Sequence, residues 1–461
     1  MLSCQLESLR DTFTAIFDEI SNEERQMAEH KTIKYVKDEQ DNGEPWFWID
    51  VLCLPRDWER KMTLLNQLHT IYKEATAVLI WDRNLLERPE PAEKNYIEMT
   101  VRLNTGQWSR RLWTLPEAVL ARRLYVAFKS GHVALNDMNK AYESAKNNVK
   151  DDYHFIWKAG RLFTSSITEI RCQMHTQELG PSESDLEPGL PVQRARKAIQ
   201  FREASHPDDQ TIVLASVLGL DMSRFVNIQP VQAARASVKF PQSQKSESVA
   251  TKRMVEFLNA LDETPGLGIP SGLIFLPQPK LPQDGYGWAP ETWMHKQRYT
   301  YPLFRPLKKT GYMMPHGLHV EFPGLILHCP TPVISQKDFW IPVAKLSINW
   351  VKGEIDGAGT NVDHLRDHLK PSDEHCIILN AEKTRERWEA GLFVKRKGTL
   401  ACGKVWRVTI CRVWVRLETR TSKLQKLKAD FQKDVLAQYF GERVDSQRWC
   451  IEESLLEVTK L

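Results

Sequence analysis

Two short segments of the chain carry side chains whose types and spacing could do chemistry. The first is Phe47-Trp-Ile-Asp-Val-Leu-Cys53, and the second is Arg110-Arg-Leu-Trp-Thr-Leu-Pro-Glu117. A carboxylate inside an apolar run is costly to bury without a partner, so Asp50 requires a reason for its position. Open α/β sheets bind ligands outside the carboxyl ends of their strands, which is where Asp50 falls if residues 46–52 form a strand. Asp50 is therefore a candidate site residue, and pairing with an arginine of the second segment is the structural alternative.

Glu117, at the end of the second segment, has a structural explanation of its own. Thr114-Leu-Pro-Glu117 is a capping-box pattern with a proline in the first turn, in which the glutamate reaches back to the backbone N–H of Thr114. Such a cap stabilises a helix start by roughly 1 kcal/mol. The residues by themselves leave a site role and a capping role open for Glu117.

The elements that must position these segments alternate between strand and helix over residues 1 to 130. Residues 46–52, 77–81 and 124–128 predict buried strands. Asp57 is placed to cap the helix between the first two strands, and a short helix is expected to begin near Thr114. An earlier helix is indicated by apolar residues at helical spacing: Leu6, Leu9, Phe13, Ile16, Phe17 and Ile20. The pattern favours an α/β fold with a parallel sheet flanked by helices.

Three further regions follow this α/β domain of residues 1–130. Residues 131–226 predict a helical extension, in which Ser205-His-Pro-Asp-Asp209 begins a helix that ends at Gly219. Residues 227–250 predict a linker, and residues 251–461 predict a β-rich module of unknown role. The strands expected in this module include residues 272–276, 324–327, 339–343 and 405–417, and a basic helix is expected over 422–439.

Composition restricts the class of protein. The chain has 461 residues, a net charge of +4 and a hydrophobic fraction of 42%, which favours several packed domains and gives no indication of nucleic-acid binding. The eight cysteines form no C-x-x-C pair or regular framework, as expected for reduced thiols, and Cys53 fits a small buried apolar residue. The absence of a leader or membrane-spanning pattern predicts a cytoplasmic protein. His364 and His368 lack the His-Glu-x-x-His order, so no metal site is expected.

The two opening segments resemble the second and third signature motifs of the fungal heterokaryon-incompatibility (HET) domain. The matching residues are Trp48-Ile-Asp-Val-Leu-Cys53 and Arg111-Leu-Trp-Thr-Leu-Pro-Glu117. Between them, Tyr72, Ala75 and Val78-Leu-Ile-Trp81 are similar to the family's helix-then-strand pattern. Further similarity to long HET proteins is found in Asp208-Asp-Gln210, Leu214 to Asp221, Gly272 to Leu276 and Gly287-Trp-Ala-Pro290.

The resemblance also implies a fold and a chemistry. HET domains are similar to TIR domains, some of which cleave NAD+ between nicotinamide and ribose, and the TIR Trp-Cys-x-x-Glu corresponds to Trp113-Thr-Leu-Pro-Glu117. By this resemblance Glu117 is the catalytic carboxylate, which would stabilise an oxocarbenium-like state, and Asp50 assists it. Trp113, Arg111, Trp48 and Cys53 are the corresponding substrate-binding candidates. NAD+ enters as a substrate, and no bound cofactor is expected.

The family pattern departs from this chain at its beginning. HET domains open with a strand that carries a Ser/His-x-Trp-Gly type motif, and the chain begins after the corresponding point, so the α/β domain is expected to lack its first strand. Pro116 stands where the family usually has glutamine.

Three functions follow from the resemblance as expectations. The first is fungal self/non-self recognition and incompatibility cell death, an immune-like response, acting through NAD+ hydrolysis. The second is a non-catalytic signalling module that self-associates through the α/β domain or binds a protein partner. The third is an inactive truncated paralogue. None of them implies a nucleic acid or a membrane span.

Overall fold

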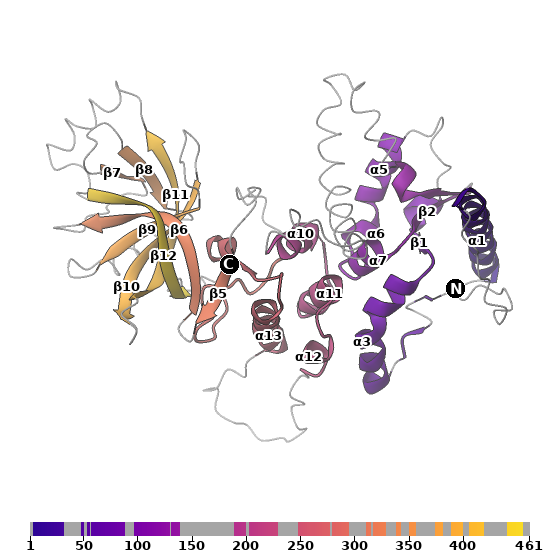
Figure 1. Ribbon diagram of the computed structural model, residues 1–461, viewed down its shortest axis with the longest axis horizontal. Coiled ribbons are helices and arrows are strands. Elements are labelled where there is room, and N and C mark those ends of the chain that lie inside the picture. The colour runs from indigo at the N-terminus through magenta and orange to yellow at the C-terminus, as the bar shows by residue number, and fades with distance from the viewer. Residues whose placement is uncertain are drawn as a thin grey trace. The chain divides into compact units, whose positions relative to one another are not determined.

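The chain divides into two compact units, which the computed structural model describes in part (Figure 1). The first unit consists of residues 1–179 and 197–227, and the second of residues 180–196 and 228–461. The described residues are 3–31, 48–49, 53–55, 57–87, 96–129, 131–138, 189–199, 202–228, 248–276, 279–294, 310–314, 317–328, 338–342, 350–355, 374–380, 389–399, 405–418 and 440–454. No helix within these ranges is long and apolar enough to cross a membrane.

A small sheet of three strands forms the centre of the first unit. Strand β1 (Val78–Ile80) pairs in parallel with β2 (Leu124–Phe128), which confirms two of the strands expected from apolar runs. Strand β3 (Gly131–Ala134) adds to β2 in the antiparallel direction, giving the order β1-β2-β3. Residues 131–134 were expected to begin the helical extension, and they form β3. A strand of four residues is too short to give a clear alternation signal.

Helix α1 (Ser3–Lys31) covers one face of this sheet. Ile16 and Ile20 of α1 pack with Tyr125 of β2, and Leu79 of β1 lies against the same cluster. The predicted apolar stripe is thus confirmed as a helix, but only part of it is buried. Leu6 is 40% exposed and Phe17 is 41% exposed, because both lie on the flank of the helix away from the sheet.

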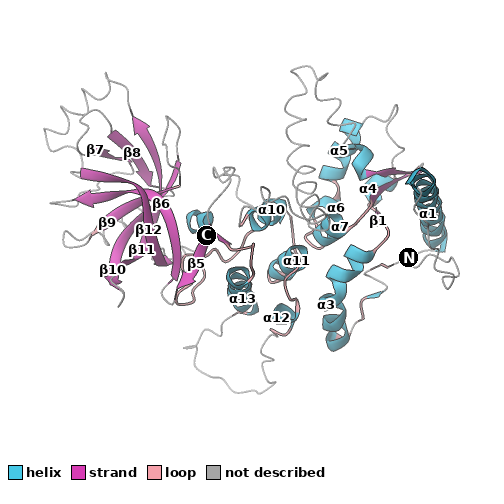
Figure 2. Ribbon diagram, in the orientation of Figure 1, coloured by secondary structure: helices cyan, strands magenta, loops and turns pink. Residues whose placement is uncertain are grey.

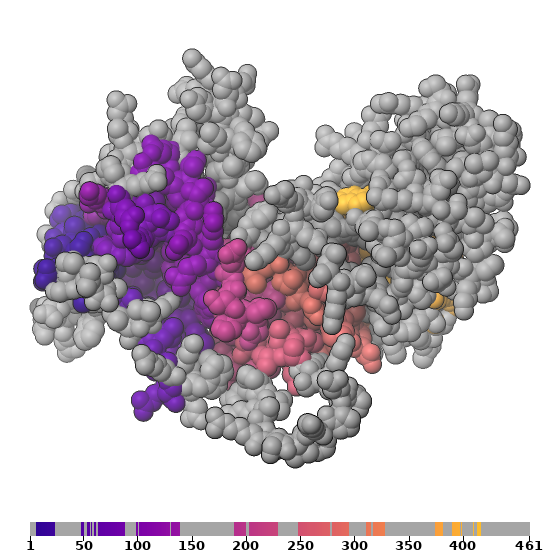
Figure 3. All heavy atoms as spheres, turned by 180° about the vertical axis from the view of Figure 1, so that it is seen from behind, coloured from indigo at the N-terminus to yellow at the C-terminus, as the bar shows by residue number. Residues whose placement is uncertain are grey.

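The opposite face of the sheet is covered by short helices (Figure 2). Ile80, Val126 and Phe128, which alternate with the residues that face α1, pack into this second cluster. The helices that supply its other members are α4 (Arg83–Leu86), α5 (Tyr96–Thr105), α6 (Gln107–Arg110) and α7 (Thr114–Leu120). In the space-filling view, the purple atoms of this region form a continuous surface (Figure 3).

A third cluster lies between helices that are far apart in the sequence. Helix α3 (Trp58–Glu74) is capped by Asp57, whose side chain accepts from the backbone N–H of Arg60, as predicted. Leu68 and Tyr72 of α3 pack with Leu120 of α7 and Val226 of α12 (Ser223–Val226). Helix α11 (Asp209–Leu218) begins close to the expected start, and it ends at Gly219, whose φ of 69° is a left-handed cap.

The expected strand over residues 46–52 is not found where the chain is described. Trp48 and Ile49 are half-buried and belong to no strand, and Cys53 is helical. The backbone N–H of Cys53 donates to the carbonyl oxygen of Ile49 at 2.9 Å, which is a helical turn. Asp50 itself lies outside the described residues. An apolar run of this length is compatible with a strand or with a buried turn of helix, and the pattern does not separate the two.

Within its described residues the second unit contains nine strands, so it is β-rich, as predicted. The order is β4-β5-β6-β9-β10-β11-β8-β7, and β12 pairs with both β11 and β6. Strands β6, β9, β10, β11 and β12 therefore pair in a closed ring, with β11–β12 as its parallel pair. The strand bounds are β4 (Ile269–Pro270), β5 (Thr310–Met314), β6 (Gly317–His328), β7 (Asp338–Pro342), β8 (Trp350–Ile355), β9 (His375–Leu379), β10 (Glu389–Thr399), β11 (Val405–Glu418) and β12 (Phe440–Ser454).

The expected strands at 324–327, 339–343 and 405–417 fall in β6, β7 and β11. Residues 272–276, by contrast, form a 3-10 helix, η4 (Ser271–Phe275), and all five of its residues are buried. The basic helix expected over 422–439 lies outside the described residues. Helix α13 (Val249–Glu263) begins after Ser248, whose hydroxyl caps the backbone N–H of Thr251.

Lys280 connects the two segments of the second unit that resemble long HET proteins, residues 272–276 and 287–290. Its Nζ donates to the carbonyl oxygens of Trp288 at 2.7 Å and Ile274 at 3.1 Å. Next to Lys280, the backbone N–H of Leu281 donates to the carbonyl oxygen of Ala289 in the second of these segments at 2.9 Å. The ammonium group thus gives a donor to the carbonyl of Ile274, near the end of η4, where the helix itself supplies none.

We expect Lys280→Met to lower the free energy of unfolding by about 2–3 kcal/mol, because charged hydrogen bonds to buried carbonyls are lost. Lys252→Met, at a half-buried lysine of α13, is the matched control and should change stability by less than about 0.5 kcal/mol. Urea unfolding followed by tryptophan fluorescence measures both variants. Equal midpoints for the two variants would show that the Lys280 contacts do not stabilise the fold.

Candidate functional site

The Arg111–Glu117 segment forms a tight connection between α6 and α7. The hydroxyl of Thr114 lies 2.5 Å from the carbonyl oxygen of Trp108 and 2.8 Å from that of Arg111. Thr114 is the first residue of α7, and the residue before it, Trp113, makes no capping hydrogen bond with its side chain. The expectation that Thr114 is the N-cap of a capping box was therefore wrong. Its hydroxyl donates to carbonyls of the preceding turn instead.

A second segment of the same unit docks onto this connection. The backbone N–H of Glu203 donates to the carbonyl of Arg110 at 2.6 Å, and the N–H of Leu112 donates to the carbonyl of Glu203 at 2.9 Å. These two bonds form a parallel bridge between Arg111 and Glu203. The segment that the sequence places in a helical extension is thus part of the structure around the Arg111–Glu117 motif.

Arg202 is the central cation of this arrangement. It is 4% exposed, and its Nη1 donates to the carbonyl of Arg111 at 2.7 Å and to the Thr114 hydroxyl at 2.8 Å. Its guanidinium carbon lies 6.0 Å from the centre of the Trp108 ring, within cation–π range. Burial lowers the pKa of Arg202 to about 9, and the negative charge of Glu117 opposes this shift. The guanidinium therefore remains charged at neutral pH.

The carboxylate of Glu117 is half-buried beside these groups. Its Oε2 accepts a hydrogen bond of 2.9 Å from the indole N–H of Trp108. Because Trp108 also packs in the cluster over the β1–β2 face, the carboxylate is fixed to the core through its indole partner. Glu117 thus lies in an environment with one strong donor and one nearby positive charge, which favours its ionised form.

Trp113 points to a different part of the unit. Its indole N–H donates to Oδ2 of Asp209 at 2.8 Å, across 96 residues of sequence. The ring lies against the cluster of Leu68 and Tyr72, where Trp48 also packs. The structure therefore brings Trp48 and Trp113 to one apolar cluster, while Glu117 belongs to the polar group around Arg202.

The structure gives fewer side-chain contacts for the remaining predicted site residues. The side chain of Arg111 is exposed, and its backbone N–H and carbonyl make hydrogen bonds within this connection. Cys53 is a half-buried free thiol. Asp50 lies outside the described residues, so its proximity to Glu117 stays a prediction.

Asp82 is a buried carboxylate that the sequence reasoning missed. It follows β1 after one residue, Trp81, at the carboxyl end of a parallel strand, and it is 5% exposed. Its Oδ2 accepts from the backbone N–H of Trp108 at 2.8 Å, and its Oδ1 accepts from that of Asn84 at 2.8 Å. Asp82 thus connects β1 to the start of the turn that carries Trp108. The position after a parallel strand is the sequence signal for Asp82, the same signal that indicated Asp50.

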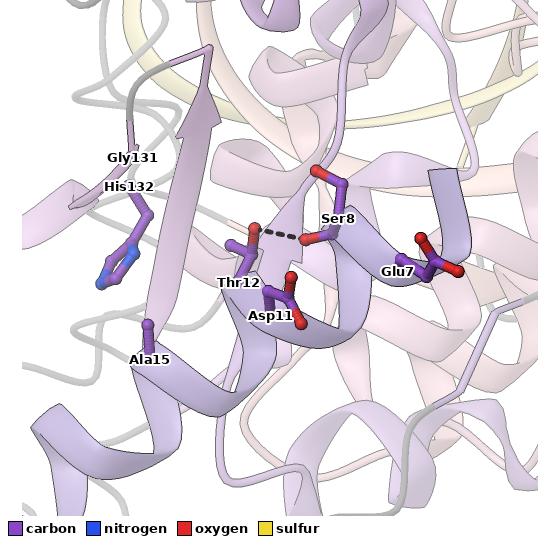
Figure 4. A pocket seen from close by; sticks show the side chains of 7 residues that line it. All are labelled: Glu7, Ser8, Asp11, Thr12, Ala15, Gly131 and His132. Atoms are coloured by element: carbon purple, nitrogen blue, oxygen red, sulfur yellow. Dashed lines mark hydrogen bonds between the residues drawn. The ribbon is translucent and has the colours of Figure 1, made fainter. Parts of the chain in front are cut away.

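An open depression of about 480 Å³ lies on the α1 side of the sheet (Figure 4). Its described lining consists of Glu7, Ser8, Asp11, Thr12 and Ala15 of α1 with Gly131 and His132 of β3. Glu117 lies with the helices on the other side of the sheet, because its hydrogen-bond partner Trp108 packs in the cluster there. The depression is therefore separate from the Arg202–Glu117 group.

These features define the first unit as a mixed α/β domain in which hydrogen bonds between distant segments hold the Arg111–Glu117 motif. Residues 18–92 match the family model described as heterokaryon incompatibility protein (HET). The first unit therefore contains a segment that is similar to a HET domain. The match includes α3, β1 and Asp82 and ends before Glu117. A search of curated proteins and a search of solved structures found no match for this chain.

Proposed function

We propose that this chain acts in fungal heterokaryon incompatibility as a signalling module, and that the Arg111–Glu117 motif has a structural role in it. The observation that carries this proposal is the hydrogen bond from the Trp108 indole to the Glu117 carboxylate. With Arg202 beside it, this bond places Glu117 within a network that joins α6, α7 and residues 202–203. Such a network fixes the shape of a domain whether or not the domain has an activity.

A signalling role implies a protein partner, which can be a second copy bound through the α/β domain. Leu6 and Phe17 on α1 are large apolar side chains that solvent can reach. The match to the HET family suggests incompatibility cell death as the biological output, a response that is similar to innate immunity. In this proposal the protein acts in the cytoplasm.

NAD+ glycohydrolysis in a TIR-like domain is the second candidate function. It is supported by the partial exposure of Glu117 and by the positive charge of Arg202, which favours an ionised carboxylate. An ionised carboxylate could hydrogen-bond a ribose hydroxyl of NAD+ and stabilise the oxocarbenium-like state as nicotinamide departs. In this proposal Asp50 assists, and Trp113, Arg111, Trp48 and Cys53 contribute to substrate binding.

Two substitutions at Glu117 separate the candidates. Glu117→Gln keeps an oxygen acceptor for the Trp108 indole, whereas Glu117→Ala removes it and should lower stability by about 1–2 kcal/mol. For the signalling role we expect no nicotinamide release from NAD+ by the purified wild-type chain, and unchanged cell death on induced expression of Glu117→Gln in a fungal host. Thermal unfolding of each variant serves as the folding control.

Nicotinamide release that Glu117→Gln abolishes at an unchanged melting temperature would replace the signalling proposal with the enzymatic one. Release that persists in Glu117→Gln would assign the activity to other residues, and it would contradict both the catalytic role of Glu117 and the non-catalytic role of the chain.

A further inference from the structure

Arg196 is a buried guanidinium on an otherwise apolar helix face. It belongs to the second unit and lies on α10 (Leu190–Ile199). Val192 and Ala195, which share its face at helical spacing, are fully buried, and Arg196 itself is 6% exposed. The side chain therefore lies with the apolar residues of the helix and not with those that face solvent.

The Arg196 side chain has donors without acceptors in the described part of the chain. Its Nε and Nη2 are both buried, and neither makes a hydrogen bond there. Burial lowers the pKa of Arg196 to about 10, and the group is still charged at neutral pH. Arg202, which is buried to a similar degree, donates to two carbonyl oxygens and a hydroxyl. Two buried nitrogens of a cation without such partners are strongly destabilising, so an acceptor for Nε and Nη2 is expected.

The chemistry of the guanidinium group restricts what that acceptor can be. Its N–H groups form a planar fork that matches two oxygens of a carboxylate or a phosphate. A negative charge would also offset the desolvation of the cation, which a neutral acceptor cannot do. Chloride offers the charge but not the paired oxygens.

We propose that Arg196 binds an oxyanion, the phosphate or carboxylate group of a ligand that this chain does not itself supply. Arg196 lies outside the residues that match the HET family, so the proposal adds a ligand-binding role to a part of the chain that the match does not include. It is independent of the function proposed for Glu117.

Thermal unfolding of the full chain in inorganic phosphate tests the site, with sodium chloride at matched ionic strength as the reference. We expect phosphate to raise the melting temperature of the wild type by a few degrees, because a ligand that binds the folded state stabilises it. Arg196→Met should remove this shift, and without phosphate it should be at least as stable as the wild type. Lys197→Met, which removes the neighbouring charge on the same helix, should keep the shift. An acetate arm distinguishes a carboxylate from a phosphate ligand.

Two outcomes would overturn the proposal. One is an equal shift in the wild type and Arg196→Met, and the other is no shift in phosphate or acetate together with a less stable Arg196→Met, which would assign the acceptor to the chain itself. If Arg196→Met does not fold, amide hydrogen exchange of wild-type α10 decides the question. Phosphate or acetate should slow exchange across Leu190–Ile199 relative to chloride, and unchanged exchange in both contradicts the site.

Discussion

Replacing Arg202 by methionine is expected to lower the free energy of unfolding by about 3–5 kcal/mol, the usual cost of removing one partner from a buried charged network. The variant loses the donors to the carbonyl of Arg111 and to the hydroxyl of Thr114, and it leaves Glu117 without its neighbouring cation. Methionine fills a similar volume, so the loss reports the polar contacts more than packing. Chemical denaturation of the full chain, monitored by tryptophan fluorescence, measures the change.

Arg111→Ala is the matched control for Arg202→Met. Arg111 lies in the same network, but its side chain is exposed and its contacts there are made by the backbone. The substitution should therefore change stability by less than about 0.5 kcal/mol. If Arg202→Met were as stable as Arg111→Ala, the docking of residues 202–203 onto the motif would depend on the backbone bridge alone.

Asp82→Ala should have the second largest effect, a loss of about 2–4 kcal/mol. Both carboxylate oxygens accept backbone N–H groups, and the N–H of Trp108 is buried, so its donor would be left without this acceptor. Asp82→Asn should recover only part of the loss, because an amide offers one oxygen and directs its NH₂ group at the other donor. Urea midpoints of the two variants give the comparison.

Asp57→Ala is the control for the Asp82 substitutions. Asp57 caps α3 at an exposed position through a single backbone N–H, that of Arg60, and its removal should cost about 1 kcal/mol. Asp82→Ala and Asp57→Ala with equal effects would mean that Asp82 acts only as a helix cap. The larger loss expected for Asp82→Ala would identify it as the link between β1 and the Trp108 turn.

The sequence was sufficient to predict an element wherever the pattern that indicates it lies within one short segment. The run Leu124–Phe128 is a buried strand, Asp57 caps α3, and Gly219 ends α11, each as predicted. The long alternation of residues 405–417 gives β11. In these cases the periodicity or the cap involves residues within one or two turns of each other, so no information about the rest of the chain is needed.

Apolar runs without a clear period were the first limit of this reasoning. Residues 272–276 were expected to form a strand, but Ser271–Phe275 form the 3-10 helix η4. All five residues of η4 are buried, and a run that is buried throughout has no polar positions whose spacing would distinguish a strand from a helix. Trp48 and Ile49 show the same ambiguity before the turn at Cys53.

The sequence by itself determined the family-like motifs, the α/β character of the first unit and the β-rich character of the second. Only the tertiary structure decided which partners the motif residues have. Arg202 meets Arg111 across 91 residues, and Trp113 meets Asp209 across 96. Hydrogen bonds of this kind depend on where folding places distant backbone and side-chain atoms. The residue types and their spacing within a motif do not indicate which distant atoms those will be. For the same reason, Glu117 could be identified from the sequence, whereas its bond to Trp108 could not.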